Sequence, residues 1–184
     1  MTKQENDFVY YPIINMGFYR TFIENLQVED LIKKAHKFKE DSLNSSVKKS
    51  NKGGYQSVPD VHTYPDFYDL TNNLNNIFFR LFKNPLQTIQ SMWINISYFE
   101  HSNYIHTHGL DPDIMSGVLY LQVPENSGEI GFVNPITHNI DNLILPTAKE
   151  LFIFPQNLPH LVNPNLSQKE RISIAFNYGS FYVN

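Results

Sequence analysis

Cysteine is absent from this chain of 184 residues, and its absence excludes several kinds of chemistry. Disulfides, thiolate metal sites and cysteine nucleophiles all need this side chain. Any metal ion must therefore be bound by histidine and carboxylate side chains. Long basic runs are also lacking and the formal net charge is −4, so we expect no general nucleic-acid binding.

Hydrophobic runs long enough to span a membrane are lacking as well. The first seven residues are polar and do not form the apolar core of a signal peptide. We therefore expect a cytoplasmic protein with no membrane partner. Apolar residues make up 41% of the chain, which suits one folded domain of this length.

Hydrophobic periodicity suggests two parts within this single domain, at about 1–88 and 89–184. Residues 8–19 predict an early strand, and residues 22–41 predict one or two amphipathic helices. Residues 41–60 are rich in Ser, Asn, Lys and Gly and predict a loop. A second helix is expected to begin at Pro65-Asp66 and to end by Pro85.

The second part contains short β-type runs separated by turns. They predict strands near 89–99, 103–108, 115–123, 129–133, 151–154, 159–163 and 171–178. Many short strands at this spacing are typical of a sandwich or barrel. We therefore predict a mainly β fold whose N-terminal helices pack on one outer face of a sheet.

Three histidines are candidate metal ligands. His106 and His108 are two residues apart in a predicted strand, so their side chains share a face about 6.6 Å apart along the strand. His160 begins another short strand, and in a rolled sheet it could complete the site from the opposite side. Three protein ligands on one face leave open positions for oxygen chemistry at the metal.

A histidine pair alone is weak evidence, because strand histidines often serve only as hydrogen-bonding residues. The metal interpretation gains strength from Arg171 and Ser173, which follow His160 on an apolar strand. The remaining histidines, at positions 36, 62, 101 and 138, are expected to be surface or structural residues.

Arg171 is the candidate clamp for a carboxylate. Strand alternation places Arg171, Ser173 and Asn177 on one face, and it places Ile172, Ile174 and Phe176 on the other. The first face is expected to line the interior, where a buried guanidinium needs an anion, and a carboxylate can accept its two parallel N–H bonds. A salt bridge to a local acidic residue or plain solvent exposure remains the alternative.

These motifs resemble the Fe(II)- and 2-oxoglutarate-dependent oxygenases, and more narrowly a group of small, largely uncharacterised bacterial and phage members. The resemblance covers about residues 53–178. It is carried by the following segments: Gly54-Tyr55-Gln56-Ser57, Trp93-Ile94-Asn95, His106-Thr107-His108, Met115 to Leu121, Phe154-Pro155 through His160, and Arg171 to Asn177.

The resemblance implies a double-stranded β-helix, that is, a cupin-like jelly roll. It implies Fe(II) bound by His106 and His160, with 2-oxoglutarate held at its far carboxylate by Arg171. Asn95, Tyr120, Ser173 and Asn177 are assigned to the co-substrate by position. Oxygen would be consumed, succinate and CO2 released, and an unknown substrate hydroxylated.

The resemblance leaves the roles of some residues open. Trp93 is expected to be a core residue rather than a substrate platform. Residues 54–57 form either a loop near the site mouth or an ordinary turn.

Position 108 departs from the superfamily, which mostly has a carboxylate there. We favour His108 as the middle ligand, with Asp111, Asp113 or water as alternatives. Two other functions stay open: a three-histidine cupin-type enzyme that does not use 2-oxoglutarate, and a non-catalytic jelly-roll binding protein. The sequence also leaves open a homodimer and the substrate class, which could be a protein side chain, a small metabolite or a nucleobase.

Overall fold

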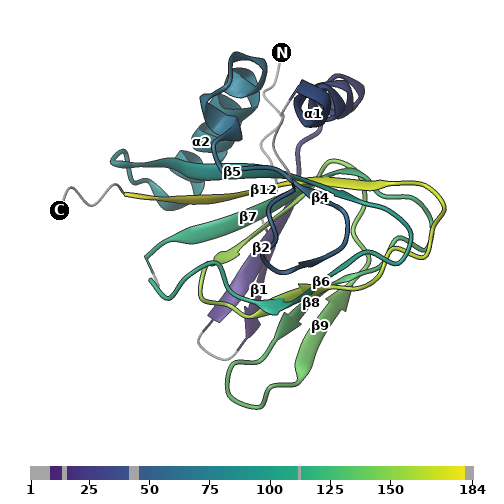
Figure 1. Cartoon of the computed structure of the whole chain (residues 1–184). Helices are drawn as coiled ribbons and strands as arrows, with labels where there is room; N and C mark the ends of the chain where they lie inside the picture. The colour runs from purple at the N-terminus through teal and green to yellow at the C-terminus, as the bar shows by residue number, and fades with distance from the viewer. Residues whose placement is uncertain (1–8, 14–15, 42–45, 112, 181–184) are drawn as a thin grey trace.

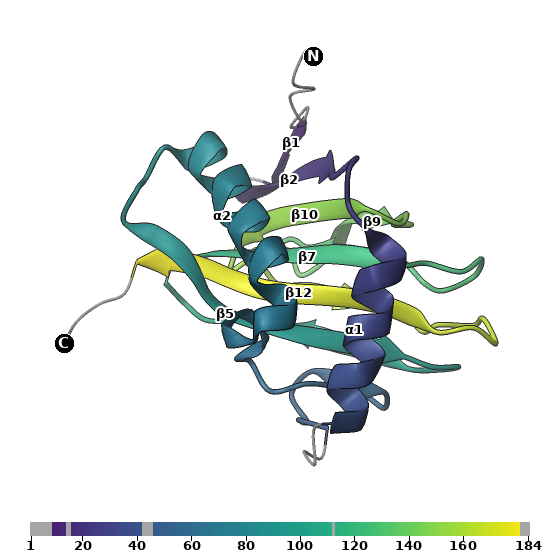
Figure 2. The ribbon, with the colours of Figure 1, turned by 90° about the horizontal axis from the view of Figure 1, so that it is seen from above.

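The computed structural model describes residues 9–13, 16–41, 46–111 and 113–180. Two antiparallel sheets are stacked face to face, and two helices lie on the outer face of the larger sheet (Figure 1, Figure 2). The predicted fold class, a mainly β jelly roll with helices packed on one sheet, is confirmed. None of the helices within the described ranges is long and apolar enough to cross a membrane.

The larger sheet has seven strands and the smaller one has five. The order in the larger sheet is β1 (Val9–Ile13), β2 (Met16–Phe22), β10 (Glu150–Pro155), β7 (Met115–Gln122), β12 (Arg171–Ser180), β5 (Gln87–Ser97) and β4 (Tyr55–Gln56). The order in the smaller sheet is β3 (Asn51–Lys52), β6 (Ser102–His106), β11 (His160–Val162), β8 (Ile130–Val133) and β9 (Ile140–Ile144).

Two helices bury their apolar stripes against the outer face of the larger sheet (Figure 2). Helix α1 (Val28–Asp41) and helix α2 (Tyr68–Phe82) both repeat apolar residues at helical spacing, and short 3-10 turns at Val61–Thr63 and Pro65–Phe67 precede α2. The main core lies between these helices and the sheet, and it includes Ile172, Ile174 and Phe176. Strand alternation then points the intervening side chains of β12 toward the smaller sheet.

The structure differs from the sequence-based expectation in four respects. The early strand is a hairpin of β1 and β2, and the predicted 41–60 loop contains the two short strands β3 and β4. Strand β9 was not predicted, because its Asp141-Asn142 pair has low strand propensity. Strands from residues 1–88 join both sheets, since β2 pairs with β10 and β3 pairs with β6.

Candidate metal and co-substrate site

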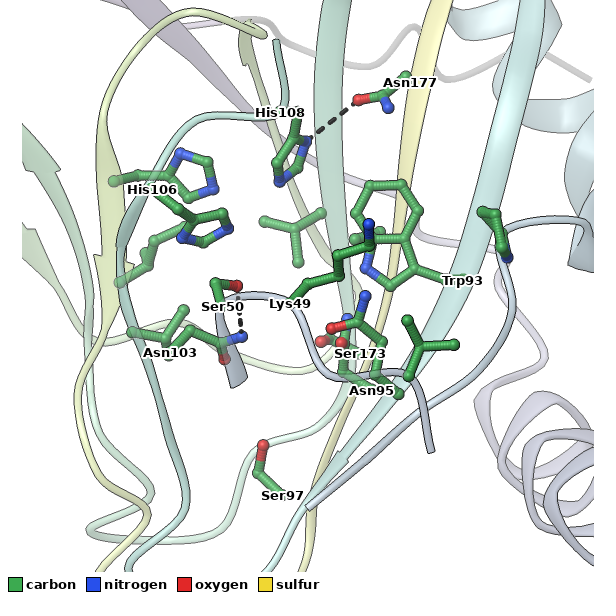
Figure 3. A pocket seen from close by; sticks show the side chains of 18 of the residues that line it. Lys49, Ser50, Trp93, Asn95, Ser97, Asn103, His106, His108, Ser173 and Asn177 are labelled. Carbon is green, nitrogen blue, oxygen red and sulfur yellow. Dashed lines mark hydrogen bonds between the residues drawn. The ribbon is translucent and has the colours of Figure 1, made fainter. Parts of the chain in front are cut away.

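A pocket of about 370 Å³ lies between the two sheets (Figure 3). Strands β5, β12 and β7 of the larger sheet form one wall, and β6, β11 and β8 of the smaller sheet form the other. The chain segment before β3 borders the pocket as well. None of the described residues that line the pocket is an aspartate or a glutamate.

The wall on the larger sheet follows from strand register. Ser173 on β12 is paired with Asn95 on β5 and with Tyr120 on β7, so these three side chains form one polar row. Asn177 is paired in the same way with Ser91 and Ser116. Except for Ser116, these side chains line the pocket together with Arg171, as the alternation of β12 predicts.

The three candidate histidines converge at the other wall. One ring nitrogen of each lies within 4.8 Å of the others, and the ring centroids are 4.2 Å apart for His106–His160, 4.9 Å for His108–His160 and 5.3 Å for His106–His108. Two nitrogens that bind one ion at about 2.1 Å each can be at most about 4.2 Å apart. Small side-chain rotations would therefore bring all three onto a single ion.

The route by which these histidines meet differs from the expected one. His160 does not approach from the opposite side: it begins β11, directly paired with His106 at the end of the adjacent strand β6. His108 does not share that strand, since β6 ends at His106 and His108 lies in the following bend. Neither Asp111 nor Asp113 belongs to the group, and an Asp111 side-chain oxygen accepts the backbone N–H of Asp113 at 2.9 Å.

Each of the three rings has its Nδ1 atom held by an oxygen acceptor. The Nδ1 of His106 lies 2.7 Å from the Tyr104 carbonyl, and that of His160 lies 2.9 Å from the Leu158 carbonyl. A carbonyl oxygen only accepts, so Nδ1 carries the proton and Nε2 keeps a free lone pair. This is the tautomer that a metal-binding imidazole needs.

His108 is oriented by a polar network instead of a carbonyl. Its Nδ1 lies 2.8 Å from the Ser116 hydroxyl and 3.1 Å from Oδ1 of Asn177 (Figure 3). Ser116 donates to the same Oδ1 at 2.7 Å, and the Asn177 amide nitrogen donates to Ser91 at 3.1 Å. These bonds fix the Asn177 amide with its oxygen toward His108. Nε2 of His108 is thereby left for a metal ion.

Burial keeps these imidazoles neutral. It lowers the pKa of His108 to about 4, and it also lowers the pKa values of His106 and His160. A proton on one ring would repel protons on its neighbours, which adds to the effect of burial for His108 and His160. At neutral pH the lone pairs are therefore available to a cation.

Arg171 lies in the same pocket without an acidic partner. It is 3% exposed, and one terminal nitrogen donates to the backbone carbonyls of Ser127 and Asn163, the latter at 3.0 Å. No carboxylate in the described part of the chain forms an ion pair with it. Burial lowers its pKa, but a guanidinium stays protonated at neutral pH, so the site holds a buried positive charge that an anion can satisfy.

The other residues assigned from the sequence are brought together only in part. Asn95, Tyr120 and Ser173 lie beside Arg171, and burial raises the pKa of the Tyr120 phenol to about 12, so it remains a hydrogen-bond donor. Asn177, assigned to the co-substrate, lines the same pocket and contacts His108.

Several lining residues were missed or misread in the sequence. Trp93, expected in the core, packs partly against it but also lines the pocket, with its ring 5.0 Å from that of His108. Gln56 and Ser57, from the segment expected to be a loop or a turn, also line the pocket, and Gln56 belongs to strand β4. Lys49 and Ser50, which lie in a polar stretch typical of a solvated loop, were not identified at all.

Comparison with known families gives a partial sequence match. A family model described as "Putative 2OG-Fe(II) oxygenase" matches residues 136–177, a segment that contains His160 and Arg171. No curated protein matches the sequence.

Solved structures match over most of the chain. A Pseudomonas putida prolyl-4-hydroxylase has a TM-score of 0.70 at 14% identity, covering 92% of this chain and 96% of that chain. The non-heme α-ketoglutarate-dependent epimerase SnoN from nogalamycin biosynthesis has a TM-score of 0.74 at 11% identity, covering 90% and 78%. HygX from Streptomyces hygroscopicus, with nickel and 2-oxoglutarate bound, has a TM-score of 0.66 at 12% identity, covering 91% and 84%.

The predicted resemblance to the 2OG-Fe(II) oxygenases is confirmed. At these identities the structural neighbours show the fold, and the family model supplies the sequence link. Over residues 136–177 the chain is thus similar in sequence to 2OG-Fe(II) oxygenases, and over most of its length it shares the fold of solved members of that superfamily. The family model begins at residue 136 and so does not include His106 or His108, whose part in the site is inferred from geometry alone.

Proposed function

We propose that this protein is an Fe(II)- and 2-oxoglutarate-dependent dioxygenase that hydroxylates its substrate and releases succinate and CO2. The proposal depends on one observation: three imidazoles with free Nε2 lone pairs share a pocket with a buried arginine that has no acidic partner.

Each part of this chain has a separate task in the proposed reaction. His106, His108 and His160 would hold the ion on one face and leave its remaining positions open. Arg171 would bind the far carboxylate of 2-oxoglutarate through its free N–H groups. Bound iron and 2-oxoglutarate would supply the oxidising chemistry.

The polar row beside Arg171 would complete the co-substrate site. The Tyr120 phenol and the Ser173 hydroxyl can each donate a hydrogen bond to a carboxylate, and Asn95 can do so through its amide. Arg171 and Tyr120 are both buried, and the low local dielectric strengthens the charge-assisted bonds that they make.

The first experiment measures binding without turnover. Protein loaded with Mn(II) in the absence of oxygen is titrated with 2-oxoglutarate, and the fluorescence of Trp93, the single tryptophan, reports occupancy of the pocket. We expect saturable binding that Arg171→Gln weakens at least tenfold, because a charge-assisted pair is lost. The matched control is Arg80→Gln, an exposed change on α2.

The second experiment measures succinate formed from 2-oxoglutarate under oxygen with Fe(II). We expect succinate from the wild type and from His138→Ala, a histidine in an exposed turn, and none from His160→Ala. Metal binding without an Arg171-dependent response to 2-oxoglutarate would instead support the three-histidine cupin-type enzyme. If replacement of both His106 and His160 changes neither metal binding nor succinate formation, the result would support a non-catalytic protein.

A further inference from the structure

The segment of residues 46–50, here called the strap, crosses from one sheet to the other at the pocket. At its start, the backbone N–H of Val47 donates to the Gln56 carbonyl at 2.9 Å, and the Ser46 hydroxyl accepts the N–H of Gln56 at 3.0 Å. At its end, the Ser50 carbonyl accepts the N–H of Tyr104 at 2.9 Å. Gln56 belongs to β4 and Tyr104 to β6, so the strap is tied to both sheets.

A tight glycine turn follows the strap and lets β3 and β4 join different sheets. Gly53 and Gly54 have φ angles of 76° and 75°, a region that side chains disfavour. A Cβ at Gly54 would lie 2.7 Å from the Ile96 carbonyl oxygen. The backbone conformation of this turn therefore holds the strap at the pocket.

The strap presents two donors to the pocket. Figure 3 shows the Lys49 side chain extending into the pocket, and both Lys49 and Ser50 line it. The Ser50 oxygen accepts a hydrogen bond from the Asn103 amide at 3.1 Å, and its own O–H can still donate to a ligand. An ammonium and a hydroxyl that line the same pocket can each donate to an oxygen of one anionic group.

The charge of the pocket calls for an anion besides the co-substrate. The two carboxylates of 2-oxoglutarate balance a divalent ion, and the three imidazoles are neutral. The charges of Arg171 and Lys49 remain, and the lining offers no acidic side chain to offset them, although the whole chain carries −4. A positive cavity in an acidic protein attracts anions selectively.

We propose that the primary substrate carries an anionic group, a carboxylate or a phosphate, and that Lys49 and Ser50 bind this group. The inference rests on the proposed function in placing a divalent ion and 2-oxoglutarate in this pocket, with Arg171 bound to the co-substrate. Lys49 is exposed and solvated at the edge of the pocket, and it is then a specificity-determining residue because only an anionic substrate can pair with its ammonium.

The experiment uses simple anions as probes and Trp93 fluorescence as the readout. Protein loaded with Ni(II) and saturating 2-oxoglutarate, without oxygen, is titrated with inorganic phosphate or with acetate at constant ionic strength. Acetamide is the neutral counterpart of acetate. We expect saturable responses to the anions and none to acetamide, and the tighter anion distinguishes a phosphate substrate from a carboxylate substrate.

Two matched lysine variants localise the effect. We expect Lys49→Gln to weaken anion binding about tenfold, the usual loss for one charge-assisted hydrogen bond. Lys48→Gln, an exposed neighbour that does not line the pocket, should leave binding unchanged. Equal anion affinity in both variants, or no saturable anion response at all, would overturn the inference.

Two further results separate this inference from the proposed function. A loss of 2-oxoglutarate affinity in Lys49→Gln as large as that in Arg171→Gln would overturn the inference, because Lys49 would then serve the co-substrate. If 2-oxoglutarate fails to bind but phosphate binding to the metal-free protein still depends on Lys49, the proposed function fails and the anion site stands.

Discussion

Asn177→Ala tests whether this residue positions His108 or binds the co-substrate. In the structure, Oδ1 of Asn177 accepts from the Ser116 hydroxyl at 2.7 Å and lies 3.1 Å from Nδ1 of His108. Alanine removes that acceptor and leaves Ser116 free to turn its hydroxyl toward or away from the ring. The His108 imidazole then loses its fixed orientation and tautomer.

The expected magnitude follows from what a hydrogen-bond partner does for a metal-bound histidine. Removing such a partner typically costs 10–100-fold in metal affinity, about 1.4–2.7 kcal/mol. We expect Asn177→Ala to fall in this range. Asn177→Asp should keep the affinity or raise it, because a carboxylate also accepts from Nδ1 and makes the imidazole more basic.

The assay is a titration with Mn(II), in which electron paramagnetic resonance measures the free ion. Asn142→Ala on β9 is the matched control, because this half-buried asparagine does not line the pocket. 2-Oxoglutarate affinity is then measured at saturating Mn(II). Unchanged Mn(II) affinity together with weaker 2-oxoglutarate binding would refute the reasoning and restore the assignment of Asn177 to the co-substrate.

Four other outcomes are expected. Arg171→Lys should weaken 2-oxoglutarate binding at least tenfold in a Trp93 fluorescence titration, because an ammonium cannot donate two parallel N–H bonds. As the pH falls from 6.5 to about 4, the metal-free protein should lose up to about 3 kcal/mol of its free energy of unfolding, measured in urea. The reason is that His108 binds a proton below pH 6.5 in the unfolded chain but only near pH 4 in the folded protein. Stability that does not change over this pH window would mean that His108 is not buried as described. His108→Asp should bind Mn(II) more tightly than the wild type in the absence of 2-oxoglutarate, since it adds a negative ligand, and weaker binding would contradict this. Leu74→Ala, on the buried face of α2, should cost about 2–5 kcal/mol in urea unfolding without changing Mn(II) affinity, and a changed affinity would show that the helix layer shapes the site.

The two faces of β12 could be predicted because strand alternation is a local property. Ile172, Ile174 and Phe176 had to meet an apolar layer, and this forced Arg171 and Ser173 to face the pocket. The same reasoning applies to the amphipathic helices, whose apolar stripes appear directly in the sequence.

The meeting of His160 with His106 could not be derived in the same way. Their contact depends on β11 lying next to β6, and strands that are more than fifty residues apart in sequence leave no local sign of such pairing. Lys49 was overlooked for a related reason: a strap that precedes two strands of only two residues each has no periodicity to detect. Local sequence patterns thus predict which face of each helix or strand is apolar. Which of these faces meet depends on strand pairing between distant parts of the chain.

The proposed use of His108 in place of a carboxylate ligand connects the metal group to the rest of the pocket. Every acceptor that holds a ring Nδ1 here is neutral, being a backbone carbonyl, a hydroxyl or an amide. The protein therefore gives a bound cation no negative charge, either directly or through a hydrogen-bonded carboxylate. Negative charge must then come from the molecules that enter the pocket, so binding of a metal ion and binding of an anionic ligand each strengthen the other. The pocket also contains Arg171, which has no acidic partner, and Lys49 on the strap. Their positive charges make the pocket still more dependent on anionic ligands.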